Sequence, residues 1–173
     1  MGRSPSSTRV AGWDHTFPAS PAGAIPPTVF ADTHTVPMNG ASLELKHYAP
    51  AHADCDIAVH FPDADIIHVG DTWCNGFYPF IDYSTGGSIN GMIRATEVNL
   101  ARVANKTIII PGHGPVADKA QLTDFRDMLV SVCDKVAALK KQGRSVAEVV
   151  ATKPTAATDA RWGGFLTPPR PFC

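Results

Sequence analysis

The chain has 173 residues, of which 44% are hydrophobic, and this is enough for one compact domain that buries roughly 70% of its unfolded surface. Its 15 basic and 16 acidic residues give a formal net charge of -1 without a basic stripe, which argues against nucleic acid as a partner. No apolar run approaches the length of about 18 residues that a membrane span needs, and the amino terminus lacks a signal-peptide core, so we expect a cytoplasmic protein without a membrane partner.

The amino-terminal segment is rich in proline. Residues 1–28 contain five prolines among scattered Ser and Gly, which predicts an extended leader without regular structure. We expect the folded domain to cover residues 29–162 and an irregular tail to follow at residues 163–173.

Two strands are predicted at the start of the domain. Side chains alternate in character from Thr28 to Val36, which is typical of a strand, and Ser42 to Tyr48 reads as a second one. The Asn39-Gly40 pair between them is a strong signal for a tight hairpin turn.

A second hairpin follows. Two runs rich in Ile and Val, Asp56 to Phe61 and Asp65 to Val69, are separated by Pro62-Asp63-Ala64, which is typical of two paired strands. Antiparallel pairing places the entry of the first strand beside the exit of the second. We therefore expect His52 and Asp71 to lie at one edge of the sheet.

The loop after Asp71 is polar and aromatic. It offers a substrate wall, with Asn75 or the amides of Gly86 and Gly87 placed to polarise a carbonyl oxygen. The alternative is that the same aromatic side chains pack the loop onto the sheet or contact a second chain. The aromatic members of the loop are Trp73, Phe77, Tyr78, Phe80 and Tyr83.

A crossover unit brings a third residue to this edge. A helix is predicted from about Ser88 to Ala104 and a strand from Thr107 to Ile110. Strands joined by such a crossover are parallel, so their carboxyl ends share one rim. His113 should therefore join His52 and Asp71 there.

A long helix completes the pattern. Asp118 is a predicted N-cap for a helix that runs to about Gln142 with an apolar face, and Gly143 is its predicted C-cap. Ser145 and Glu148 have the spacing of a capping box for a last short helix.

The three residues of the rim are plausible metal ligands. Imidazole and carboxylate donors such as His52, Asp71 and His113 suit zinc first, with manganese or iron next. Cys55 and Cys74 each follow one of these residues by three positions. Their thiolates are candidate additional ligands or disulfide partners, and the alternative is that they are incidental loop residues.

Several short motifs occur in a defined order: His52 with Asp56 four residues later, Gly70-Asp71-Thr72, residues 75–82, residues 85–88 and Pro111-Gly112-His113-Gly114. In this order and spacing they resemble the carboxyl-terminal half of a metallo-β-lactamase-fold hydrolase. The resemblance covers about residues 17–162. It implies an α/β (α+β) fold, namely half of an αββα sandwich with a mixed β-sheet and flanking helices.

The resemblance also implies a role for each ligand. His52 would complete the three-histidine set of a first metal, Asp71 would bridge two metals, and His113 would bind the second. Asp56 would support the site, either by orienting a ligand histidine or by accepting hydrogen bonds from loop amides. The family's His-x-His-x-Asp-His signature does not occur in this chain, so one chain alone does not complete an ordinary dinuclear site.

Three functions remain open at this point. The first is a metal-dependent hydrolase, with one or two zinc ions or else iron or manganese, that acts on an ester, lactone, thioester or amide bond of a small molecule and is truncated and impaired as a lone chain. The second is a non-catalytic half-domain that dimerises and binds at most one metal. The third is a metal-free module that binds small molecules. Because half of the sandwich would leave a sheet face or edge uncovered, we expect a homodimer.

Overall fold

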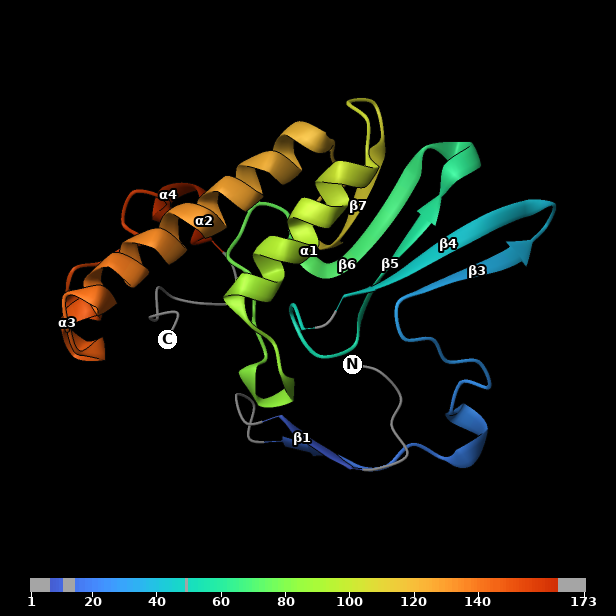
Figure 1. Cartoon of the computed structure of the whole chain (residues 1–173), viewed down its shortest axis with the longest axis horizontal. Helices are drawn as coiled ribbons and strands as arrows, with labels where there is room; N and C mark the ends of the chain where they lie inside the picture. The colour runs from blue at the N-terminus through green and yellow to red at the C-terminus, as the bar shows by residue number, and fades with distance from the viewer. Residues whose placement is uncertain (1–6, 11–14, 49, 165–173) are drawn as a thin grey trace.

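The computed structural model describes residues 7–10, 15–48 and 50–164. Its centre is a five-stranded mixed sheet (Figure 1), whose strand order follows the chain. Neighbouring strands are antiparallel except for the last pair, which is parallel. The strands are β3 (Thr33–Met38), β4 (Ala41–Tyr48), β5 (Asp56–Phe61), β6 (Ile66–Cys74) and β7 (Ile108–His113).

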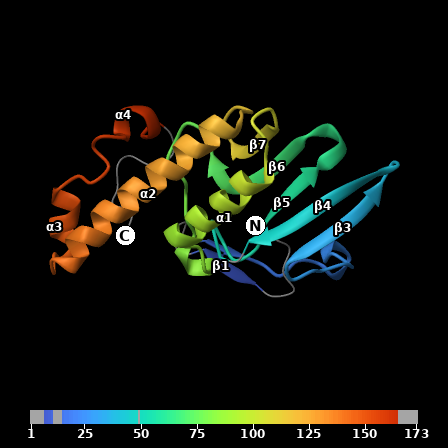
Figure 2. The same ribbon diagram turned by 45° about the horizontal axis from the view of Figure 1, so that its top comes forward.

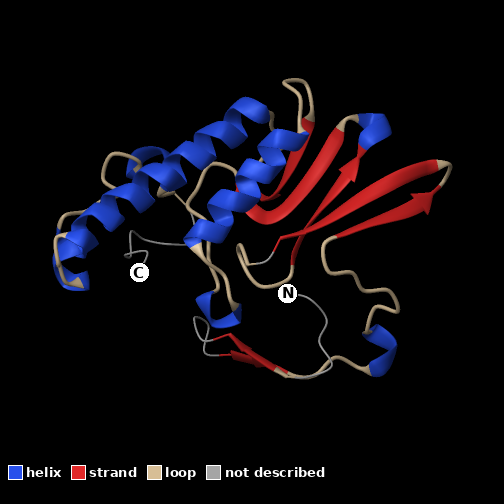
Figure 3. Ribbon diagram, viewed as in Figure 1, coloured by secondary structure: helices blue, strands red, loops and turns tan. Residues whose placement is uncertain are grey.

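Two helices lie side by side on one face of the sheet (Figures 1 and 2). The first is α1 (Ile89–Arg102), capped by the Ser88 hydroxyl, and the second is α2 (Lys119–Lys141), capped by the Asp118 carboxylate. Two short helices follow, α3 (Val146–Ala151) and α4 (Asp159–Trp162). Single 3₁₀ turns are also present (Figure 3): η2 (Ala22–Ala24), η3 (Pro62–Ala64) and η4 (Tyr83–Thr85).

The hydrophobic core fills the space between the sheet and these helices. Its central contact runs from Trp73 of β6 through Phe125 of α2 to Trp162 of α4, with ring centroids 6.5 Å and 5.8 Å apart. Burial of these large rings fixes α2 and α4 against the sheet. Other fully buried members are Ile67, Val69, Met92, Ile109 and Leu122.

The opposite face of the sheet is mainly apolar, and the two long helices α1 and α2 do not lie on it (Figure 1). Because side chains alternate along each strand and the strand register is known, the residues on this side can be identified. Met38, Ile57 and Ile108 are 51%, 41% and 45% exposed. We call this surface the open face, and its apolar members are Val36, Met38, Leu43, Leu45, Ile57, Val59, Phe61, Ile66, Ile108 and Ile110.

Most predicted elements are confirmed. Asn39 and Gly40 form the two-residue turn between β3 and β4, with φ angles of +52° and +80°, as a type I′ turn requires. The strand at Asp56–Phe61 has the predicted bounds. The capping box of Ser145 and Glu148 forms, and Gly143 follows α2 with φ of +76°.

Three strand predictions were wrong at their ends. The first strand begins at Thr33 rather than at Thr28, because β4 offers partners only for residues 33–38. Strands β6 and β7 extend to Cys74 and His113, since their parallel pairing continues past the purely apolar runs. Both Asp71 and His113 therefore lie within strands.

The leader contains more structure than its proline content predicts. Strands β1 (Thr8–Val10) and β2 (His15–Phe17) pair antiparallel, and β1 contacts η4. The rest of the predicted leader from 1–6 and 11–14, and the predicted tail at 165–173, lie outside the described residues. None of the described helices is long and apolar enough to cross a lipid bilayer.

Candidate metal centre

The pairing of β6 with β7 is irregular at the point where Asp71 lies. The register shifts between His68 and Gly70 and again between Gly70 and Cys74. Gly70 has φ of +56°, a left-handed conformation that glycine adopts easily, and its amide donates to Nδ1 of His68 at 3.1 Å. Such irregularities redirect side chains at sheet rims, and here the Asp71 carboxylate projects between two histidines.

The three residues predicted to share one rim are close together. Nε2 of His113 lies 3.2 Å from Oδ1 of Asp71, and Nε2 of His52 lies 3.7 Å from Oδ2 of the same carboxylate. The predicted proximity, which was inferred from strand order alone, is therefore found in the structure. Asp71 stands between the two imidazoles and offers each a different oxygen.

The His52 ring is oriented by the loop that follows β6. Its Nδ1 lies 2.7 Å from the carbonyl oxygen of Phe80. A carbonyl only accepts hydrogen bonds, so Nδ1 carries a proton, and in the neutral imidazole Nε2 is the atom whose lone pair is free on the Asp71 side. The amide of Asp82 donates to the His52 carbonyl at 2.9 Å, so the same loop holds the backbone of His52 as well.

Asp56 supports the His52 loop in one of the two ways predicted for it. The amide of Ala53 donates to its Oδ2 at 2.8 Å, which closes the short loop that carries His52. Burial raises the pKa of the Asp56 carboxyl; the Asp71 charge acts in the same direction, while the Ala53 hydrogen bond and His52 act in the other. The carboxylates of Asp56 and Asp71 thus lie in one partly buried region beside His52. Two negative groups in such a region favour the binding of a cation.

Both glycines of the Pro-Gly-His-Gly segment are required by their neighbours. A β-carbon on Gly112 would overlap the Asp71 carboxylate and would lie 2.7 Å from the carbonyl carbon and oxygen of Gly70. Gly114 has φ of +91°, and a β-carbon there would overlap the carbonyl oxygen of Asn75. These two glycines let His113 approach Asp71 while the chain turns sharply around Asn75.

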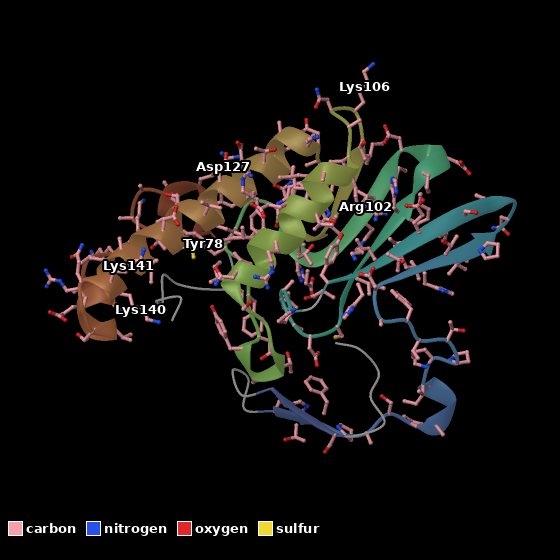
Figure 4. All side chains as sticks on the ribbon, viewed as in Figure 1. Tyr78, Arg102, Lys106, Asp127, Lys140 and Lys141 are labelled. Atoms are coloured by element: carbon pink, nitrogen blue, oxygen red, sulfur yellow. The ribbon has the colours of Figure 1, made fainter. Side chains whose placement is uncertain are left out.

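Two of the five aromatic residues of the predicted substrate wall, Trp73 and Tyr78, are buried, whereas Tyr83 is exposed. Trp73 is fully buried in the core. The Tyr78 hydroxyl donates to the Asp159 carboxylate at 2.8 Å and bonds the Thr158 hydroxyl at 2.7 Å, so the side chain joins this loop to the carboxyl-terminal segment (Figure 4). For these two aromatics the structure supports the alternative, in which they pack the loop in place. Phe80 lies nearer the rim, with its ring 5.8 Å from that of His52.

The groups predicted to polarise a carbonyl oxygen already have partners. Asn75 is buried, and its side-chain amide donates to the Pro115 carbonyl at 2.8 Å. The amide of Gly87 donates to the Asp82 carbonyl at 2.8 Å, and that of Gly86 reaches the Tyr83 carbonyl at 3.4 Å. The sequence predicts that these residues lie near the rim. It does not predict that their NH groups already donate to backbone carbonyls of the surrounding loops.

The two cysteines near the rim differ from each other. Both are free, so they do not form the disulfide that was one of the options. Cys55 is exposed. Burial raises the pKa of the Cys74 thiol to about 12, and the charge of Asp71 acts in the same direction, so Cys74 is a neutral thiol at physiological pH.

No three His, Cys, Asp or Glu side chains of the described residues converge on one point that could hold a metal ion. At the rim, the two histidines approach different oxygens of Asp71. The donor types match zinc chemistry. The arrangement fits a carboxylate shared between two metals that take further ligands from elsewhere, and it does not fit a three-ligand site for one metal.

No protein family matches the sequence, and no curated protein matches it. Solved structures do match the fold. The sec-alkylsulfatase Pisa1 from Pseudomonas sp. has a TM-score of 0.60 and 16% identity, over 74% of this chain and 22% of that one. The B3 metallo-β-lactamase BLEG-1 has a TM-score of 0.55 and 17% identity, over 70% of this chain and 55% of its own. A metallo-β-lactamase from Pontibacter korlensis has a TM-score of 0.50 and 19% identity, over 61% and 49%.

These similarities define the class of fold. The chain forms a partial metallo-β-lactamase-type domain, with a mixed sheet and flanking helices, as the sequence resemblance implied. It matches 49% and 55% of the length of the two β-lactamases and 22% of the alkylsulfatase.

Proposed function

We propose that this chain supplies His52, Asp71 and His113 to the metal centre of a hydrolase. We propose further that the substrate is a small molecule with an ester, lactone, thioester or amide bond. The observation that supports the proposal most directly is the approach of His52 and His113 to opposite oxygens of Asp71. The fold, which this chain has in common with solved β-lactamase and sulfatase structures, agrees with it.

His52, Asp71 and His113 would each supply a ligand to a centre of two metals, with zinc as the first choice and iron or manganese as the alternatives. The Phe80 carbonyl keeps the proton of His52 on Nδ1, so Nε2 is ready to donate its lone pair without a change of tautomer. In hydrolases zinc supplies two effects, a lower pKa of a water molecule and polarisation of the carbonyl under attack.

Other residues of the chain would keep these ligands in place. Ala53 and Asp56 close the loop that carries His52, and Gly112 leaves room for the Asp71 carboxylate. The Phe80 ring beside His52 offers an apolar surface for the part of a substrate next to the scissile bond. The remaining metal ligands would come from outside this set, either from another chain or from Cys55, which is exposed.

A second function is favoured by the open face. Its strand positions carry no Asp, Glu, Lys or Arg, so two copies of the chain can meet there without repulsion between like charges. We propose as the alternative a non-catalytic half-domain in which a homodimer covers this face and at most one metal binds. Exposed apolar surface of this extent on a sheet calls for a covering layer.

Metal content per chain, measured on protein purified without chelator or histidine tag, separates the two functions. Near two equivalents of zinc in the wild type, falling by about half in His113→Ala but not in His34→Ala, supports the hydrolase, and hydrolysis of ester and lactone substrates should fall with the metal. His34 is the matched control because it lies on the open face and stacks on Phe30, away from the rim.

Other results favour the alternatives. Well under half an equivalent of metal in a dimeric sample contradicts the hydrolase and supports the half-domain. If chelators change neither the stability nor the binding of a small molecule, the chain is a metal-free binding module instead. The molecular mass in solution is recorded on the same samples.

A further inference from the structure

Asn75 makes two separate contacts with the segment that contains His113. Its backbone amide donates to the His113 carbonyl at 2.9 Å, and its side-chain amide donates to the Pro115 carbonyl at 2.8 Å. Asn75 itself is buried, at 6% exposed. One residue at the end of β6 thus holds the backbone on both sides of Gly114.

The turn between these two carbonyls wraps closely around Asn75. At Gly114 the backbone has φ of +91°, and an added β-carbon would lie 3.1 Å from the carbonyl carbon of Asn75 and 3.2 Å from its β-carbon. There is no space for the turn to shift towards Asn75 without a clash. The two hydrogen bonds prevent it from moving away.

We propose that Asn75 is a positioning residue for His113, which sets the direction in which that imidazole faces Asp71. The His113 side chain is about half exposed, and its Nε2 reaches Asp71 across the rim, so little besides its backbone fixes where the ring can go. The backbone of residues 113–115 is fixed by Asn75. This inference deepens the proposed function, because it rests on His113 being a metal ligand when it predicts an effect on metal binding.

The hydrogen bond to Pro115 requires a side chain that donates. An amide NH₂ donates to a carbonyl oxygen, whereas a carboxylate of the same shape presents only acceptors to it. Replacement by Asp therefore converts a hydrogen bond into a repulsive contact with almost no change in volume. Replacement by Ala leaves the Pro115 carbonyl without this donor.

The test compares Asn75→Asp and Asn75→Ala with Asn99→Ala. Asn99 is the matched control, because it is a buried asparagine on α1 whose side-chain hydrogen bonds, with Thr72 and Tyr48, do not involve residues 113–115. Two readouts are used on the full chain: the imidazole ¹H–¹⁵N resonances of His113 and His52 in metal-free protein, and zinc affinity by competition with a chelator.

In the metal-free protein, the His113 resonances should move in both Asn75 variants, while those of His52 stay in place and Asn99→Ala alters neither. Zinc affinity should fall about 10- to 100-fold in the Asn75 variants, the range typical for residues that orient a ligand. Asn75→Asp keeps the side-chain volume, so it provides a second variant if Asn75→Ala does not fold.

Unchanged His113 resonances in a folded Asn75 variant would overturn the inference, as would an equal disturbance by Asn99→Ala. The two proposals fail in different ways. A wild-type chain that binds no zinc overturns the proposed function, and the metal-free resonances then decide the role of Asn75 on their own.

Discussion

The substitution Gly112→Ala tests the geometry of the rim most directly. Gly112 is not in a left-handed conformation, so alanine brings no backbone strain, and its only effect is the volume of one methyl group. That methyl would overlap the Asp71 carboxylate and would lie 2.7 Å from the Gly70 carbonyl carbon and oxygen. The variant therefore measures how tightly β7 packs against the residues that hold Asp71.

The size of the effect follows from these contacts. An ordinary contact between a carbon and a carbonyl oxygen is about 3.3 Å, so β6 and β7 must separate by about 0.6 Å at Gly70, and the Asp71 carboxylate must rotate away. Overpacking of this kind costs about 1–3 kcal/mol. For a chain of 173 residues this corresponds to a fall in Tm of about 2–12 °C.

Urea denaturation followed by circular dichroism measures the free energy of unfolding of Gly112→Ala against that of Gly23→Ala. Gly23 has no atom within 4 Å of an added β-carbon and no positive φ, so its variant should differ from the wild type by no more than about 1 kcal/mol. Combining Gly112→Ala with Asp71→Ala should recover part of the loss, because the overlapping carboxylate is then gone. A Gly112→Ala protein as stable as the control would show that Gly112 does not pack this closely on the Gly70 carbonyl.

Three further predictions follow from the same structure. Iodoacetamide at pH 8 should label Cys55 rapidly and Cys74 only after unfolding, because Cys74 is buried and its pKa is raised to about 12; equal rates in the native protein would contradict this. Burial raises the pKa of the Asp56 carboxyl above its unfolded value. Its contribution to the free energy of unfolding is therefore complete in acid, where the carboxyl is protonated, and is lost as pH rises through the folded pKa. Asp56→Asn should then gain stability relative to the wild type as pH increases towards 7 in the presence of chelator, and a difference independent of pH would refute it. If a homodimer covers the open face, Ile57→Lys should give a monomer by sedimentation equilibrium while Val98→Lys, an exposed position on α1, should not; a dimer in both would place the interface elsewhere.

The fold could be predicted from the sequence where local signals and the hydrophobic pattern agreed. Asn39-Gly40 determined one turn by its own backbone preferences, and Ser88, Asp118 and Ser145 marked helix starts with side chains that do cap them. Agreement between such local signals and the overall pattern is what makes an element predictable.

The proximity of the rim residues was predictable for a different reason. His52 and Asp71 are brought together by one hairpin, and His113 by one parallel crossover, so strand order alone determines which ends meet. Side-chain orientation was not needed for this step. For the same reason, the prediction could not say which oxygen of Asp71 each histidine approaches.

The loop residues were assigned less well, because their roles depend on which groups already have partners. Trp73, Asn75 and Tyr78 are chemically suited to contact a substrate, and their positions after Asp71 place them near the rim. Two of them instead use their polar atoms to hold other segments, Asn75 at Pro115 and Tyr78 at Asp159, while Trp73 continues the strand into the core. A residue type indicates what a side chain can bind, but only the tertiary structure shows whether that capacity is still available.

The rim and the open face depend on each other because they share two strands. Strands β6 and β7 supply Asp71 and His113 to the rim, and the same two strands supply Ile66, Ile108 and Ile110 to the open face. A layer that covers the open face would therefore restrict the strands that carry two of the proposed ligands. The metal and the covering layer should both favour the same arrangement of β6 and β7. Binding of one should therefore stabilise binding of the other. It follows that the zinc affinity of the isolated monomer should be weaker than that of any assembly in which the open face is buried.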